Sequence, residues 1–124
     1  MILNGSCLCG RISYRISCVR EDAEVILCFC SVCRKANGSA FSANLRVRLS
    51  DFELESGEES LTTYSSSPGK IRVYCAHCHS PLYHIKESEA DYLTVKLGTL
   101  DSWNQTLSEL PRREIFKEEA LPWL

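Results

Sequence analysis

The chain has 124 residues, with 14 basic and 16 acidic side chains and a formal net charge of −2. This length is typical of one domain with its own hydrophobic core, so a single domain over residues 1–124 is expected. The basic residues are scattered and the net charge is small, which argues against a dedicated nucleic-acid-binding surface.

The N-terminal segment MILNGSCLCG has neither the basic start nor the apolar stretch of a secretory signal peptide. The longest apolar run, from Val25 to Cys30, is far shorter than a membrane span. We therefore expect a soluble, cytoplasmic protein with no membrane partner.

Apolar and polar residues alternate with a period of two along much of the chain, which predicts mainly β-strands. Ile12, Tyr14 and Ile16 share one face of the first predicted strand. The clearest strand is FSANLRVRL, from Phe41 to Leu49, with Ser42, Asn44, Arg46 and Arg48 on the face opposite its apolar residues. Shorter strands are predicted over residues 24–27, 52–55, 61–64, 71–75, 82–86 and 92–97.

Helix is scarce in this pattern. Residues 31–37 can form one or two turns that end at Gly38, and residues 103–107 can form another short helix. The segment SSSPGK, residues 65–70, is the best candidate for a mobile surface loop. Together these features predict an all-β or β-rich fold.

Eight cysteines, at positions 7, 9, 18, 28, 30, 33, 75 and 78, need an explanation in a chain of this size. An even number would suit four disulfides in a secreted protein, but no export signal is seen. In a reducing cytosol, closely spaced cysteines are typical of metal ligands, so metal binding is favoured over a disulfide framework.

Cys7 and Cys9 form a C-x-C pair, and Cys75 and Cys78 form a C-x-x-C pair, a common half of a zinc site. In a regular strand, residues two positions apart in the sequence lie about 7 Å from each other. Cys7 and Cys9 can therefore share a metal only if the chain bends between or beside them. Gly10, directly after the pair, permits such a bend. The two halves together predict a four-cysteine structural zinc site.

Cys28, Cys30 and Cys33 remain as a group of three thiols within six residues. Catalytic zinc sites have three protein ligands and an open position, whereas structural sites have four ligands. Zinc takes sulfur ligands readily, so the open position would accept water or an incoming thiolate. A thiol that coordinates zinc loses its proton near neutral pH. The triad therefore predicts a catalytic zinc site that binds a substrate thiol.

Simpler interpretations compete with this one. Cys18 could be a fourth ligand of the triad, which would make a second structural site. Cys30 and Cys33 could form a redox pair, although no βαβ pattern supports a thioredoxin-like fold. The three histidines near the second cysteine pair are expected to be solvated or core residues rather than ligands: His77, His79 and His84.

The segments GSCLCGRISYRI, CFCSVCRKANGSAF, YCAHCHSPL and GTLD, with a closing WL, are similar to the glutathione-dependent formaldehyde-activating enzyme family. The similarity runs from about Gly5 to Leu124. Its ordered set of cysteine motifs, C-x-C, then C-x-C-x-x-C, then C-x-x-C, carries the resemblance.

This resemblance implies a β-tent type fold of several coiled antiparallel sheets and two zinc ions per chain. It implies a structural zinc on Cys7, Cys9, Cys75 and Cys78, and a catalytic zinc on Cys28, Cys30 and Cys33. It also implies the family reaction, in which the glutathione thiol adds to formaldehyde to give S-hydroxymethylglutathione, a carbon–sulfur lyase reaction in reverse.

Two positions depart from the family pattern. Phe29 stands where members often have histidine, which removes a polar group beside the triad. His79 stands where glycine commonly follows the last cysteine. Neither position is a predicted zinc ligand, so the departures bear on the substrate more than on the metals.

In the mechanism that these residues suggest, a thiolate on the triad attacks formaldehyde held within ~3.5 Å, and most of the gain is proximity. The carboxylates of glutathione would pair with nearby cations, for which the candidates are Arg34, Lys35, Arg46 and Arg48. Two alternatives remain: a non-catalytic protein that binds glutathione or another thiol, and a scaffold with two structural zinc ions.

Overall fold

A computed structural model describes residues 1–103 and 105–123 of the chain. Its strands form a four-stranded sheet, in the order β10-β1-β2-β5, and a seven-stranded sheet, in the order β11-β3-β4-β9-β8-β7-β6. The small sheet contains β1 (Ile2–Ser6), β2 (Ser13–Ser17), β5 (Phe52–Ser56) and β10 (Leu100–Ser102). The large sheet contains β3 (Glu24–Cys28), β4 (Ser42–Arg48), β6 (Leu61–Ser67), β7 (Lys70–Cys75), β8 (Pro81–Lys86), β9 (Tyr92–Lys96) and β11 (Arg112–Ile115). The prediction of a β-rich fold is confirmed.

The pairing of these strands is antiparallel except at one edge of the large sheet, within the described residues. There β11 runs parallel to β3. The resemblance implied antiparallel sheets, so this parallel edge is a difference. It brings the C-terminal part of the chain beside the strand that ends at Cys28.

The one α-helix of the described residues is α1 (Ser31–Asn37), which ends at Gly38 in the left-handed conformation (φ 72°), as predicted. Short 3-10 helices join many of the strands: η1 (Arg20–Asp22), η2 (Leu49–Asp51), η3 (Glu58–Ser60), η4 (Glu87–Glu89), η5 (Leu97–Thr99), η6 (Gln105–Glu109) and η7 (Lys117–Glu119). The short helix predicted over residues 103–107 overlaps η6, and its residue 104 lies outside the described residues, as does the closing Leu124.

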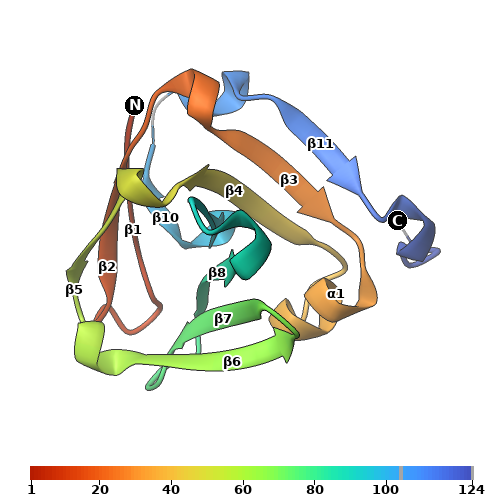
Figure 1. Ribbon diagram of the computed structural model, residues 1–124, viewed down its shortest axis with the longest axis horizontal. Helices are drawn as coiled ribbons and strands as arrows, with labels where there is room; N and C mark the ends of the chain where they lie inside the picture. Colours follow the sequence, from red (N-terminus) through yellow and green to blue (C-terminus); the bar gives the residue numbers. More distant parts are fainter. Residues whose placement is uncertain (104, 124) are drawn as a thin grey trace.

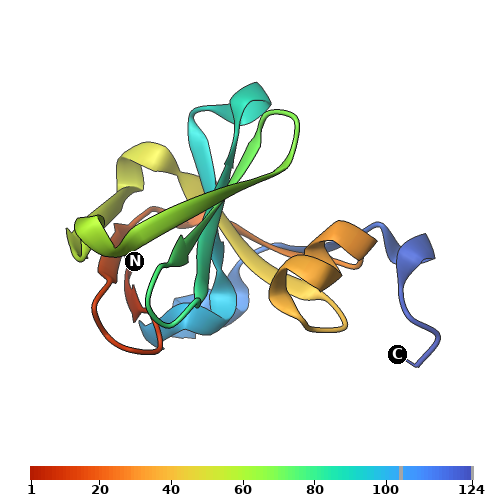
Figure 2. The same ribbon diagram turned by 90° about the horizontal axis from the view of Figure 1, so that it is seen from below.

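The strands lie on three sides of the molecule in Figure 1: the small sheet on the left, β3, β4 and β11 at the upper right, and β6 and β7 at the bottom. Strands β4 and β7 belong to one sheet, joined through β9 and β8. The large sheet therefore bends strongly across its width. Figure 2 shows α1 and the C-terminal segment on the same side of the molecule, away from the N-terminus.

The hydrophobic core combines side chains of both sheets. Fully buried members include Leu3, Ile12, Tyr14, Ile16, Leu45, Val47, Leu93 and Val95. Phe52 connects the two sheets, because its ring stacks on Tyr14 at 5.3 Å and contacts Tyr83 at 5.0 Å between centroids. The apolar faces predicted for the strands at residues 12–16 and 41–49 thus supply much of this core.

The other face of the large sheet is polar, yet much of it is buried. Register pairs Arg72 with His84, His84 with Thr94, and Thr94 with Arg46, which makes one row of side chains across four strands. Ser42 and Asn44 of β4 lie on this face and are 0% and 2% exposed. The alternating sequence pattern predicted these polar residues on the face opposite the core, yet in the structure they are shielded from solvent. This polar face carries the candidate site.

Three strands and one loop differ from the predictions. Strands β1, β10 and β11 were not predicted, because ILNGS, LDS and RREI are short and carry few apolar residues. Most of the predicted loop at residues 65–70 is strand: β6 continues to Ser67, which pairs with Lys70, and Gly69 supplies a φ of 75° at the short turn between them.

Across the described part of the chain, no helix combines the length and the apolar character needed to cross a membrane.

Candidate functional site

Four cysteine thiols, from two distant parts of the chain, meet in one cluster. The sulfur of Cys9 lies 3.6 Å from that of Cys7 and 3.7 Å from that of Cys75, and with Cys78 all four lie within 4.8 Å of one another. A tetrahedral zinc with Zn–S bonds of about 2.3 Å requires sulfur–sulfur distances of about 3.8 Å. The cluster therefore has the size of a zinc site, and all eight cysteines are free rather than disulfide-bonded.

Local backbone geometry brings the first two of these thiols together. The Gly10 N–H donates to the Cys7 carbonyl, and Gly10 has a φ of 81°, so the chain turns sharply after Cys9. The Ile12 N–H then donates to the Cys7 sulfur at 3.4 Å. The bend required by the C-x-C spacing is thus present.

Hydrogen-bond donors around Cys75 and Cys78 favour the thiolate form of these two residues. The His77 and Cys78 N–H groups donate to the Cys75 sulfur at 3.4 and 3.5 Å. A hydrogen bond with the Ser80 hydroxyl lowers the pKa of Cys78 to about 5. Donors aimed at sulfur stabilise thiolates, which are the form that binds metal.

The second cluster is the triad of Cys28, Cys30 and Cys33, whose sulfurs also lie within 4.8 Å of one another. Cys28 ends β3, Cys30 is the N-cap of α1, and Cys33 lies in the first turn of that helix. The Cys33 N–H donates to the Cys30 sulfur at 3.3 Å, so Cys30 acts in the way that serine does at helix starts. Cys18 is buried in the core between the sheets and belongs to neither cluster.

The thiols of the triad differ in their electrostatic environment. Burial raises the pKa of Cys33, but the hydrogen bond from Arg72 and the charge of Lys70 outweigh it and lower the value to about 7. Burial raises the pKa of Cys28 to about 12. A neutral thiol is therefore stable at Cys28 unless a metal replaces its proton, as zinc does with its thiol ligands.

The triad lines a cavity of about 220 Å³ on the polar face of the large sheet. Four cationic side chains share this cavity with the thiols: Arg46, Lys70, Lys86 and Arg113. Glu89 also lines the cavity and pairs with Arg46 at 2.8 Å and with Lys86 at 3.9 Å. Arg113 pairs with Glu24 at 3.0 Å, whereas Lys70 has no ion pair within the described residues. The cavity is therefore positively charged and suited to an anionic ligand.

Further positive charge is buried beneath the same face. Lys96 is 7% exposed, and its ammonium donates to Ser42 Oγ and Asn44 Oδ1, both at 2.9 Å. Burial and the charge of Arg72 lower the pKa of Lys96 to about 8. His84 lines the cavity, and burial, followed by the charge of Lys70, lowers its pKa to about 2. The His84 imidazole is therefore neutral at physiological pH.

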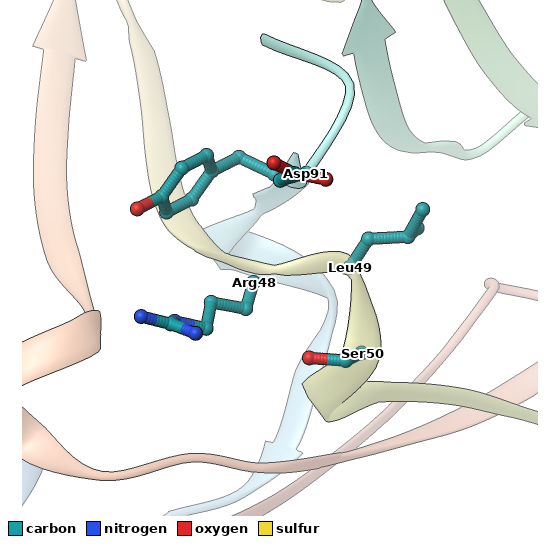
Figure 3. Close-up of a pocket in the computed structure, with 5 residues that line it drawn as sticks. Arg48, Leu49, Ser50 and Asp91 are labelled. Carbon is teal, nitrogen blue, oxygen red and sulfur yellow. The ribbon is translucent and has the colours of Figure 1, made fainter.

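The structure brings only one of the four predicted carboxylate-binding cations to the triad. Arg46 lines the cavity, but Arg34 donates from Nε to the Phe29 carbonyl at 3.2 Å, and Lys35 is exposed on α1 outside the cavity lining. Arg48 pairs with Asp22 at 3.4 Å and lines a separate, thiol-free cavity of about 420 Å³. Figure 3 shows this second cavity, with Arg48 beside Leu49, Ser50 and Asp91.

Sequence reasoning missed Lys70, Arg72, Lys86, Lys96 and Arg113 as neighbours of the triad. They come from four strands that follow the triad in the chain by 37 residues or more, so only strand register could have placed them there. Phe29 packs its ring on Phe41 at 5.5 Å and is outside the cavity lining. His77 and His79 are exposed, as expected for solvated histidines.

The fold and the two clusters define a class of protein: a β-rich fold of two sheets that has two cysteine clusters suited to bind metal ions, one of four thiols and one of three. The family described as glutathione-dependent formaldehyde-activating enzyme matches residues 2–119, nearly the whole chain. The chain belongs to this family.

Two individual proteins are similar to the chain. A protein of Halomonas elongata named "Putative glutathione-dependent formaldehyde-activating enzyme" is 33% identical over 90 residues, which cover 67% of this chain and 55% of that protein. The match thus spans about half the length of that relative. A crystal structure of a Rhodobacter sphaeroides protein has a TM-score of 0.66 and 26% identity, covering 89% of this chain and 99% of the other.

Proposed function

We propose that this protein is a zinc-dependent enzyme of carbon–sulfur lyase type that forms S-hydroxymethylglutathione from glutathione and formaldehyde. One observation carries the proposal: three thiols, with no fourth ligand atom grouped with them in the described residues, line a cationic cavity. Three protein ligands and an open position are typical of catalytic zinc. Family membership supports the choice of substrates.

The two clusters have separate roles in this proposal. Cys7, Cys9, Cys75 and Cys78 hold a structural zinc within a single domain, and Cys28, Cys30 and Cys33 hold the catalytic one. Zinc, when bound at the triad, supplies a soft Lewis acid that keeps a sulfur ligand deprotonated near neutral pH.

The cations of the cavity bind the substrate. Glutathione has two carboxylates, and Lys70 is free to pair with one of them because it has no ion pair within the described residues. Lys86 would join it in exchange for its 3.9 Å ion pair with Glu89. Arg46 and Arg113 are placed to pair with the other, in exchange with their present acidic partners. Charge-assisted hydrogen bonds of this kind orient the substrate thiol toward the triad.

The chemical step forms one bond and moves one proton. The substrate sulfur attacks the carbon of formaldehyde, a C–S bond forms, and the electron pair of the C=O π bond goes to oxygen. The proton lost by the thiol ends on that oxygen through water in the cavity. The residues contribute mainly by holding the two reactants in contact, which converts a bimolecular step into an effectively unimolecular one.

Replacement of Cys30 by serine tests the proposal. Serine is a strong N-cap, so Cys30→Ser keeps the start of α1 while it removes one thiol of the triad. We expect native mass spectrometry to find two zinc ions in the wild type and one in Cys30→Ser. Exchange between glutathione and formaldehyde, measured by NMR, should exceed the uncatalysed rate only in the wild type.

Cys18→Ala is the matched control, because it removes a buried thiol that belongs to neither cluster. It should retain two zinc ions and full turnover. Unchanged turnover in Cys30→Ser would contradict the proposal. Glutathione bound by the wild type without faster exchange would instead identify a non-catalytic thiol-binding protein.

A further inference from the structure

Arg72 is the largest fully buried side chain among the described residues, with 2% of its surface exposed. It extends from β7, and two of its three nitrogens have partners: Nε donates to Ser66 Oγ at 2.8 Å and Nη2 donates to the Cys33 sulfur at 3.6 Å. Nη1 has no hydrogen-bond partner among the described residues. The guanidinium therefore faces the triad with part of its donor capacity unused.

No carboxylate of the residues that the structure describes compensates this buried charge. Every ion pair of the described residues uses other cations, and the other buried cation, Lys96, is likewise held only by neutral oxygens. A buried charge without a counter-charge is strongly unfavourable. Two such cations beneath one cavity indicate that the cavity contains an anionic group when the protein works.

The triad can supply that anion. Three thiolates with one divalent metal ion have a net charge of −1, and a fourth, incoming thiolate makes it −2. Arg72 touches one of these sulfurs, and Lys96 lies beneath the same face of the sheet. The charges of the two cations and of the complete site cancel.

We infer that Arg72 is a positioning residue for the triad: its hydrogen bond fixes the Cys33 sulfur in place for the metal, and its charge compensates the negative site. The inference rests on the proposed binding of metal at the triad, and it adds a residue outside the cysteine motifs. The hydrogen bond also draws electron density from the Cys33 sulfur, so its loss should change the energy of thiolate-to-metal charge transfer, while loss of orientation and of charge compensation weakens binding. Ser66 fixes the orientation of the guanidinium.

The test measures metal affinity rather than turnover. Native mass spectrometry at fixed pH, with increasing chelator, follows the loss of the second zinc, which Cys30→Ser assigns to the triad. Arg72→Gln should lose this second zinc at a ~10–100-fold lower ratio of chelator to protein, because loss of a partner of a metal ligand typically weakens metal binding by that factor. The zinc of the four-thiol cluster should be unaffected.

Two further variants make the result specific. Arg46→Gln removes one positive charge from the same cavity, but this charge is already paired with Glu89, so affinity for the second zinc should hardly change. Arg72→Lys keeps the charge but cannot reach both Ser66 and Cys33 with a planar fork, so its affinity should lie between those of Arg72→Gln and the wild type. Cobalt substitution adds a spectroscopic readout: the thiolate-to-cobalt absorption of the triad should shift in both Arg72 variants.

An unchanged affinity for the second metal in Arg72→Gln overturns the inference. Where that variant does not fold, an unchanged affinity and an unchanged cobalt spectrum in Arg72→Lys overturn it. The proposed function is judged separately. A wild type that binds two zinc ions but does not accelerate exchange refutes the enzyme and leaves the role of Arg72 intact.

Discussion

Substitution of Gly57 by alanine should destabilise the fold beside the cluster of Cys7, Cys9, Cys75 and Cys78. Gly57 lies between β5 and η3 with a φ of 87°, a conformation that favours glycine. A Cβ atom at this position would overlap the carbonyl oxygen of Arg11 and lie 2.8 Å from the Cα of Ile12. Both obstacles are backbone atoms, which cannot rotate out of the way as a side chain can.

The magnitude follows from two contributions. The left-handed conformation costs a residue with a Cβ about 1–2 kcal/mol, and forced displacement of packed neighbours typically costs about 1–3 kcal/mol. The expected loss of stability is about 3 kcal/mol, which corresponds to a fall in Tm of roughly 10 °C for a domain of this size. The displaced segment carries the Ile12 N–H that bonds to the Cys7 sulfur, so metal at this cluster should also be held less tightly.

Gly38→Ala is the matched control. Gly38 has a φ of 72°, but no atom lies within 4 Å of a Cβ built there, so this variant measures the backbone contribution alone. Guanidinium titrations of zinc-saturated protein, followed by circular dichroism, should place Gly57→Ala about 2 kcal/mol below Gly38→Ala. Equal stability of the two variants would refute the steric argument.

Three further predictions concern single side chains. His79→Gly should stabilise the protein by about 0.5–1 kcal/mol in the same titration, because His79 is exposed with a φ of 64°; a loss of stability would show that its side chain makes a favourable contact. His84 should remain neutral between about pH 8 and 5, with constant ring ¹⁵N shifts in NMR. Its folded pKa of about 2 lies below the unfolded 6.5, so its contribution to stability declines as the pH falls below about 6.5; a titrating ring would contradict its burial. Lys70→Gln should raise KM for glutathione about 10–100-fold, the value of a charge-assisted hydrogen bond, whereas Lys35→Gln, outside the cavity lining, should not.

The cysteine clusters could be predicted because ligand spacing is local. Cys28, Cys30 and Cys33 lie within six residues, and the four-thiol cluster is made of two closely spaced pairs, which are specific as a pair of pairs although either pair alone is a weak signal. The alternation from Phe41 to Leu49 likewise showed the two faces of β4, because strand period depends only on neighbouring residues.

The cavity around the triad could not be predicted in the same way. Lys70 and Arg72 reach it only because β7 joins the sheet through β8 and β9, and register across four strands depends on long-range packing. Arg34 and Lys35, adjacent to Cys33 in sequence, were the natural candidates. The direction in which α1 leaves the triad instead turns Arg34 back to the Phe29 carbonyl and exposes Lys35.

The two clusters differ in the sequence distance between their cysteines, and this difference sets the order in which they can assemble. Cys28 and Cys33 are joined by a short loop, and closing a short loop requires little loss of chain entropy. Cys9 and Cys75, in contact at 3.7 Å, are 66 residues apart, so their cluster can form only after the chain has been synthesised through β7. On a growing chain, the three thiols of the triad emerge and can meet a metal ion long before Cys78 exists. The site with fewer protein ligands is thus the first to be complete, and the site with four is the last.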